Sequence, residues 1–347
     1  MRTLHLYAIR NLQRCTLALA IALCVSTSAL APADSPTTAA SQSVSAPAGF
    51  TGLWTTTYGA MRLNVIGDDV HGTYAWNGVA EITGKRDGDR AFSFSYSQPD
   101  GERGTGRFEL AADGDSFAGT WKTASGGGGN WSGARNRPVP GRVWLIVLEE
   151  NWESSLAAPE YSYGQMLRSF FTRVPHVEVR HRFVHSIADV RRWSSEAAYF
   201  AEPVVLYISS HGAPSGAIVG SDVVGAKELI DCTKHIDDLR LLHFGACEMM
   251  SGDIPQQIAA ARAPGQARFP ISGFTRPADW AGSAIVDFTY LELVLARGMP
   301  PAEAAEQTRK LIKFADEDAG TAIPGSGLKL YVPMSNPSAS QPAEHDE

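Results

Sequence analysis

Two reactive side chains, His211 and Cys247, each follow a short apolar run of the sequence almost at once. The runs are Val204–Ile208 and Leu239–Phe244, and both lead into small residues. A cysteine thiolate is a strong nucleophile, and an imidazole can take its proton and later return it to a leaving amine. These residue types therefore predict a thiol–imidazole catalytic pair, with the backbone N–H groups of Gly212 and Cys247 as candidate donors of an oxyanion hole.

The apolar runs indicate how such a pair would be positioned. Continuous Val, Ile and Leu runs of this length are typical of strands buried on both faces of a parallel sheet. Ligands of α/β proteins bind at the carboxyl ends of such strands. Strand-like and helix-like segments also alternate along residues 141–333. We therefore expect an α/β fold with a mainly parallel sheet covered on both faces, and His211 and Cys247 meeting at one edge.

The order of the two residues discriminates between classes of thiol hydrolase. The single histidine after Cys247 is His345, in the C-terminal tail. A papain-like enzyme needs a base downstream of its nucleophile, and so does an α/β-hydrolase with a cysteine elbow. The elbow here would read Gly245-x-Cys247-x-Met249, which lacks the last glycine of that motif. The base must therefore precede the cysteine, and His211 lies in glycine-rich sequence just beyond a buried strand.

The motifs His211-Gly212 and Ala246-Cys247, each at the end of a hydrophobic strand, resemble the caspase-like clan of cysteine peptidases. That clan includes caspases, metacaspases, legumains, gingipains, separases and CHAT domains. The sequence GACEMMSG is similar to the cysteine motifs of CHAT domains and legumains, and residues 271–311 look like a CHAT-type closing region. The resemblance implies a caspase-like three-layer fold and endopeptidase chemistry, with His211 as general base and Cys247 as nucleophile.

The expected partner is a peptide or protein substrate, whose side-chain preference the sequence leaves open. Metacaspases carry an acid two residues before the cysteine that helps to bind a basic substrate residue, and this chain has Gly245 there. Glu149 and Glu150, just past the first predicted strand of the α/β segment, and Asp279 are the candidate substrate-binding acids. The alternative for each is an exposed loop acid.

An N-terminal leader predicts export. Three arginines precede the apolar run Leu17–Val25, and small residues follow it. This pattern indicates a signal peptide over residues 1–33, cleaved after Ala33 or, as a competitor, after Ala29. The apolar run is shorter than the roughly 20 residues that span a bilayer. We therefore expect no transmembrane span after processing, and a periplasmic or secreted, extracellular protein.

Processing leaves two cysteines, which gives Cys247 a second interpretation. A Cys232–Cys247 disulfide would close a loop of about 15 residues and stabilise the fold by roughly 3 kcal/mol. It would also remove the nucleophile and leave a catalytically silent caspase-like scaffold. Cys232, however, falls on or after a predicted helix between the two strands, so we favour the free thiol.

A β-rich segment precedes the α/β segment. Short alternating runs such as Phe92-Phe94-Tyr96 recur at about ten-residue spacing between turn-forming residues. This predicts an all-β antiparallel meander barrel or sandwich, whose pattern of short strands and turns loosely resembles that of avidin and lipocalin barrels. We interpret its aromatic residues as core or rim packing, and the alternative is a mouth that holds a small ligand or glycan. These residues are Trp54, Tyr74, Trp76, Trp121 and Trp131.

The predicted organisation has six parts. They are a signal peptide (1–33), a disordered linker (34–48), the β-domain (49–135), a linker (136–140), the caspase-like α/β domain (141–333) and a disordered tail (334–347). The net charge of −7, with no basic run, argues against a nucleic-acid partner. We expect no cofactor and no metal site, since His181 and His185 would lie about 13 Å apart on a strand.

These observations support an exported cysteine endopeptidase. The alternative is a binding protein whose β-domain holds the ligand.

Overall fold

The computed structural model of the 347-residue chain describes residues 49–153, 155, 157–262, 267–316 and 325–333. The predicted signal peptide, the linker before residue 49 and the C-terminal tail lie outside the described residues. Within the described part, no helix is both long and apolar enough to cross a membrane.

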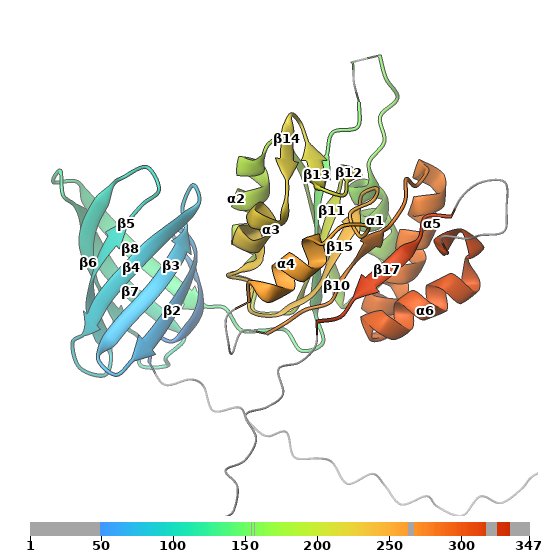
Figure 1. Cartoon of the computed structure of the whole chain (residues 1–347). Coiled ribbons are helices and arrows are strands. Elements are labelled where there is room, and N and C mark those ends of the chain that lie inside the picture. Colours follow the sequence, from blue (N-terminus) through green and yellow to red (C-terminus); the bar gives the residue numbers. More distant parts are fainter. Residues whose placement is uncertain (1–48, 154, 156, 263–266, 317–324, 334–347) are drawn as a thin grey trace, which may run out of the picture. The chain divides into compact units, whose positions relative to one another are not determined.

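Eight antiparallel strands form a closed barrel in the N-terminal part (Figure 1). The first strand pairs with the second on one side and with the eighth on the other, which closes the ring. The β-rich segment is therefore a barrel rather than a sandwich. Its strands are β1 (Gly52–Thr56), β2 (Gly59–Ile66), β3 (Asp69–Ala75), β4 (Val79–Arg86), β5 (Ala91–Ser97), β6 (Arg103–Leu110), β7 (Ser116–Thr123) and β8 (Gly128–Arg135).

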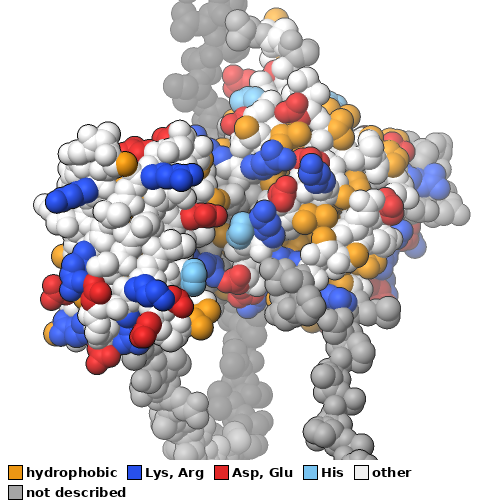
Figure 2. Space-filling view, turned by 60° about the vertical axis from the view of Figure 1, so that its left-hand side comes forward, with side chains coloured by type: hydrophobic (Ala, Val, Ile, Leu, Met, Phe, Trp, Pro, Cys, Tyr) orange, Lys and Arg blue, Asp and Glu red, His pale blue; other side chains and the backbone are white. Residues whose placement is uncertain are grey.

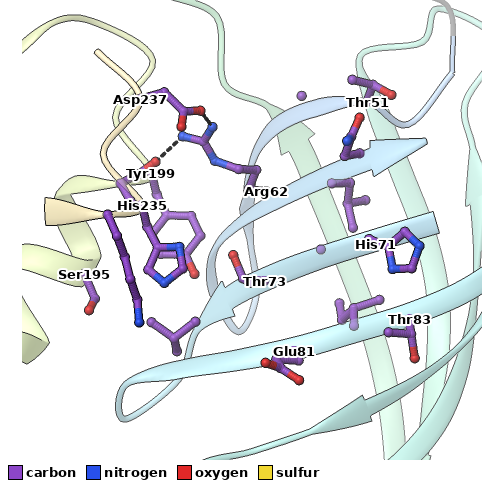
Figure 3. A pocket seen from close by; sticks show the side chains of 18 residues that line it. Thr51, Arg62, His71, Thr73, Glu81, Thr83, Ser195, Tyr199, His235 and Asp237 are labelled. Atoms are coloured by element: carbon purple, nitrogen blue, oxygen red, sulfur yellow. Dashed lines mark hydrogen bonds and ion pairs between the residues drawn. The ribbon is translucent and has the colours of Figure 1, made fainter. Parts of the chain in front are cut away.

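The barrel strands show why alternating sequences fold in this way. Successive side chains of a strand point to opposite faces, so every second residue enters the barrel. Phe92 and Phe108 meet inside, fully buried, with ring centroids 5.3 Å apart. Polar side chains such as Arg62, His71 and Glu81 lie on the outer face of β2, β3 and β4 (Figure 3). The interior is thus an aromatic core.

A six-stranded sheet forms the centre of the α/β part, in the order β10-β9-β11-β15-β16-β17. Every neighbouring pair is parallel except β16 and β17, so the edge strand β17 alone runs against the others. The predicted mainly parallel sheet is confirmed. The strands are β9 (Val143–Glu150), β10 (Val177–Val184), β11 (Val204–Ser209), β15 (Leu239–Gly245), β16 (Ile271–Phe274) and β17 (Leu328–Tyr331).

Helices cover both faces of this sheet, which gives three layers (Figure 1). Strand β11 shows the reason, because Leu206 and Ile208 enter one core and Val205 and Tyr207 enter the other. The first core includes α2 (Ile187–Ala197), α3 (Ala226–Thr233) and α4 (Ile254–Ala260). The second includes α1 (Tyr163–Phe171), α5 (Trp280–Leu291) with its π-helical extension η1 (Glu292–Ala296), α6 (Pro301–Leu311) and η2 (Lys313–Ala315).

A small antiparallel sheet follows the carboxyl end of β11. It consists of β12 (His211–Ala213), β13 (Gly216–Val219) and β14 (Asp222–Val224). The predicted histidine of the catalytic pair is thus the first residue of this small sheet.

Charged side chains of both signs are interspersed on the face that Figure 2 shows. A protein that binds nucleic acid would instead gather its basic side chains on one face, where they contact the phosphates.

Candidate active site at the carboxyl edge of the sheet

The neighbouring strands β11 and β15 deliver His211 and Cys247 to the same edge of the sheet. The strands are parallel, and their last paired residues are Ser209 and Gly245. His211 and Cys247 each follow two residues beyond that pair. The expectation that the two apolar runs are parallel neighbours is therefore confirmed.

Gly212 brings the two strand ends into direct backbone contact. A Cβ atom added to Gly212 would lie 2.4 Å from the carbonyl oxygen of Cys247 and 3.0 Å from its nitrogen. Any side chain at this position would therefore displace the cysteine loop, and glycine permits the close approach. The peptide groups of Gly212 and Cys247, the candidate oxyanion donors, consequently lie side by side.

The Cys247 thiol is free and half-buried. The backbone N–H of Ala278 donates to its Sγ at 3.4 Å, and Sγ lies 3.9 Å from the Ala278 carbonyl oxygen. Ala278 follows β16, the next parallel strand, so a third strand end fixes the sulfur in position. Sequence reasoning missed this contact, because it depends on which strand lies beside β15.

The residue after the cysteine has an unusual backbone. Glu248 has a φ of 58°, in the left-handed region that non-glycine residues seldom adopt. Such conformations persist where the surrounding structure holds them, and they cluster at functional sites. Here it turns the chain sharply at the end of β15, directly after the sulfur.

Cys232 is the second thiol, and the structure separates it from Cys247. It lies on α3 within the first core, 2% exposed, and both cysteines are free. Burial raises the pKa of the Cys232 thiol to about 11. The disulfide alternative for Cys247 is thus contradicted, since Cys232 is packed into the helical layer.

His211 is exposed, and an aromatic ring contacts its imidazole. The ring centroid of Trp152 lies 5.0 Å from that of His211, with the two planes at 73°. Trp152 comes from the segment after β9, the strand on the other side of β11. Its indole Nε1–H donates to Glu149 Oε1 at 2.9 Å. The groups of this candidate site thus come from the ends of four adjacent parallel strands, three through side chains and β16 through the Ala278 backbone.

Glu149 holds Trp152 in place, and its predicted role in substrate binding stays a prediction. Its carboxylate is fully buried. It accepts hydrogen bonds from Trp152 Nε1, Ser162 Oγ and the backbone N–H groups of Tyr163 and Gly164, and His181 Nε2 lies 2.8 Å from Oε2. Ser162 is the N-cap of α1, so a helix N-terminus faces this negative charge.

These contacts set the ionisation of Glu149. Burial opposes its charged form, but the bonds from His181, Ser162, Gly164 and Trp152 outweigh it, and the net pKa of the carboxyl is lowered.

Glu150 is the last residue of β9, and Asp279 lies in the segment after β16. Glu150 Oε1 accepts from the Gly220 N–H at 2.8 Å, in the turn between β13 and β14. Asp279 is exposed and caps α5, accepting from the Gly282 N–H at 2.9 Å. Asp279 directly follows Ala278, which contacts the Cys247 sulfur. Their role in substrate binding stays a prediction.

Asn151 and Glu153, which flank Trp152 in the sequence, line a cavity of about 730 Å³. It is lined by the segment after β9 and by the start of α1, and Glu153 and Glu160 are among its side chains. Two acids favour a cationic group there. No group of three His, Cys, Asp or Glu residues in the described chain is placed to hold a metal ion.

A second constellation lies inside the fold. The imidazole of His243 lies 2.7 Å from Ser272 Oγ through Nδ1 and 2.9 Å from Asp287 Oδ1 through Nε2. The hydroxyl of Tyr207 donates to the other Asp287 oxygen at 2.6 Å. These residue types match a serine-hydrolase triad, but all four side chains are fully buried. His243 is thus a satisfied core residue. The sequence offers one signal for its partner, because Asp287 is the one acid in the apolar sequence of α5.

Comparisons with known proteins add little to this geometry. No protein-family model and no curated protein matches the chain. Among solved structures, it is similar to the crystal structure of caspase-1 from Spodoptera frugiperda, with a TM-score of 0.38 and 11% identity, over 55% of this chain and 86% of that chain. The structure of pro-sf-caspase-1 is similar with the same two values, over 57% and 94%. At this TM-score the likeness assigns neither a family nor an activity.

Proposed function

We propose that the chain is an exported, caspase-like cysteine endopeptidase that uses His211 as general base and Cys247 as nucleophile. The observation that carries the proposal is the parallel register of β11 and β15, which ends both strands at the same level with these two residues just beyond. The base precedes the nucleophile along the chain, as in the caspase-like clan.

The proposed reaction uses groups at this edge. The His211 imidazole takes the thiol proton, and the Cys247 sulfur attacks the carbonyl carbon of the scissile peptide bond. The N–H groups of Gly212 and Cys247 donate to the oxygen that becomes negative in the tetrahedral intermediate. The imidazolium then gives its proton to the leaving amine, and a thioester remains. Water activated by the neutral imidazole hydrolyses the thioester and restores the thiol.

The pair is tested by two variants and a matched control. Cys247→Ala and His211→Ala should each abolish cleavage of a diverse peptide library, as measured by mass spectrometry of the products. Cys232→Ala removes the other thiol and should retain cleavage. Equal cleavage by the wild type and both site variants would refute the proposal.

Gly212 gives a finer test of the oxyanion site. Gly212→Ala places a methyl group against the Cys247 carbonyl, so the cysteine loop must move. Displacing a reacting group by about 1 Å costs roughly 10²-fold in rate. Alkylation of Cys247 by iodoacetamide should persist in this variant while peptide cleavage falls. Unchanged kcat/KM would show that this backbone contact has no part in the chemistry.

Export is tested separately, by N-terminal sequencing of protein recovered from outside the cytoplasm. A new terminus after residue 29 or 33 supports it, and an intact Met1 contradicts it.

A further inference from the structure

One end of the barrel interior is a cup of aromatic side chains. The cup has a volume of about 70 Å³ and is lined by six aromatic residues together with Gln98 and Glu102. Tyr74 and Trp131 are buried against the barrel core and form its floor, whereas Trp76 is 37% exposed at its rim. The cup is therefore a shallow, open site above a packed interior.

The rings of the cup stand nearly at right angles to one another. The ring centroid of Tyr58 lies 5.8 Å from Trp76, 5.6 Å from Trp121 and 5.3 Å from Trp131, at interplanar angles of 70°, 86° and 77°. These rings all line the cup, and the face of an aromatic ring carries negative electrostatic potential. Trp121 Nε1 donates to the Tyr58 hydroxyl at 3.1 Å, which fixes two of the walls.

Two buried polar atoms of the cup have no hydrogen-bond partner within the described chain. They are the Tyr96 hydroxyl and Gln98 Oε1. The other end of the Gln98 amide donates to the Tyr74 hydroxyl at 3.0 Å, so the unpartnered oxygen is held in a fixed orientation. Buried polar atoms in folded proteins nearly always have a partner, and the unpaired negative ends of these two dipoles favour a cationic group in the cup.

The charge of the cup is negative. Glu102 is exposed at its edge, and the residues that line it include no Lys or Arg. Burial raises the pKa of Tyr74 to about 12, and the neighbouring carboxylates of Glu102 and Asp100 add to that rise.

We propose that this aromatic cup binds an organic ammonium head group, such as the trimethylammonium group of choline. Perpendicular ring faces attract a cation, and a negative rim adds to that attraction. The volume favours a compact group, because it is less than half of the roughly 150 Å³ of a cavity that holds benzene. This site is separate from His211 and Cys247, and it does not depend on the proposed peptidase activity.

The full chain is tested with choline and with its uncharged isostere 3,3-dimethylbutan-1-ol, by isothermal titration and tryptophan fluorescence. Choline should bind about tenfold more tightly than the isostere, because the two differ only in charge. N-acetylglucosamine is the third probe and should bind more weakly than choline. Absence of choline binding, equal affinity for the isostere, or tighter binding of the sugar would each overturn the proposal.

Variants locate the binding in the cup. Trp76→Ala removes an exposed wall and should weaken choline binding about tenfold. Glu102→Gln should weaken it by a smaller factor, about threefold. Glu109→Gln removes an exposed acid of β6, the strand that begins directly after Glu102, outside the cup, and should leave affinity unchanged. Equal affinities in the wild type, Trp76→Ala and Glu102→Gln would place any binding elsewhere and refute the assignment.

Vesicles distinguish the two sources of such a group. If choline binds, co-sedimentation with phosphatidylcholine but not phosphatidylglycerol vesicles identifies a lipid head group as the ligand. Absence of co-sedimentation identifies a free solute. Both results agree with the proposal.

Discussion

The α/β part holds two histidine constellations, one at the surface beside a thiol and one in the core beside a serine and an aspartate. His211 is exposed at the end of β11, with the free thiol of Cys247 at the end of the neighbouring strand. His243 lies within β15 itself, fully buried between Ser272 and Asp287. Each ring nitrogen of His243 has a hydrogen-bond partner, but no substrate can reach this buried set. Position relative to the strand end therefore separates a candidate catalytic histidine from a structural one.

Substituting each histidine in turn is the strongest way to break this comparison. His211→Gln should lower kcat for peptide cleavage by about 10²–10⁴-fold, because the proton acceptor is lost. Its melting temperature should stay unchanged, since the side chain is exposed. His243→Gln should instead lower the melting temperature, because Ser272 and Asp287 lose their shared partner. The reverse pattern would mean that the buried set is the reactive one.

Asp287 sharpens the structural side of the comparison. Asp287→Ala removes the acceptor of Tyr207 and the partner of His243, so we expect the free energy of unfolding to fall by about 3–5 kcal/mol. Asp279→Ala, which removes an exposed helix cap of α5, should cost about 1 kcal/mol. Urea denaturation measures both. Equal losses would show that the buried network has no special role in stability.

The two thiols offer the same contrast without any mutation. Burial raises the pKa of Cys232 to about 11, so its alkylation at pH 8 should be about 10²-fold slower than that of an ordinary thiol. Steric protection by the surrounding core slows the reaction further. Cys247 is half-buried at the sheet edge and should react first with iodoacetamide. Peptide mapping by mass spectrometry over time gives both rates. Faster labelling of Cys232 would contradict the placement of that residue in the core.

Glu149 gives the smallest expected effect, one that depends on pH. Its pKa is lowered in the folded state, so its contribution to stability is present above about pH 4.5 and is lost as pH falls through the folded value. Glu149→Gln should reduce the free energy of unfolding at pH 7 by about 1–2 kcal/mol. The difference from the wild type should shrink below pH 4, as followed by urea denaturation. Glu150→Gln, with one backbone bond, is the control.

The sequence predicted the elements of this fold better than the surroundings of its side chains. Val204–Ile208 is apolar on both faces and Leu239–Phe244 nearly so, and this pattern predicts buried parallel strands and their shared edge. The role of Glu149 was not predictable in the same way. A glutamate at a strand end reads as a loop acid, and its burial depends on α1, whose N-terminus folds back over it. The Ala278 contact likewise depends on strand order.

The barrel shows the same limit. Alternation predicted its strands, but it did not predict which aromatic residues reach the cup. Trp54 is buried and donates to the Phe50 carbonyl at 2.9 Å, whereas Trp76 lies at the rim. Sequence spacing does not predict this difference, because it depends on how the neighbouring strands are staggered in the barrel.

The proposed base and the proposed nucleophile are carried by different sheets. Cys247 continues a central strand of the large sheet, while His211 begins the small sheet β12-β13-β14, whose far turn is tied to Glu150 through Gly220. Ser210 is the one residue between the two sheets on that side. The first core also holds Ala217, Val219 and Val224 of the small sheet, so the position of the proposed base depends on the packing of that core, whereas the sulfur is carried by the large sheet itself.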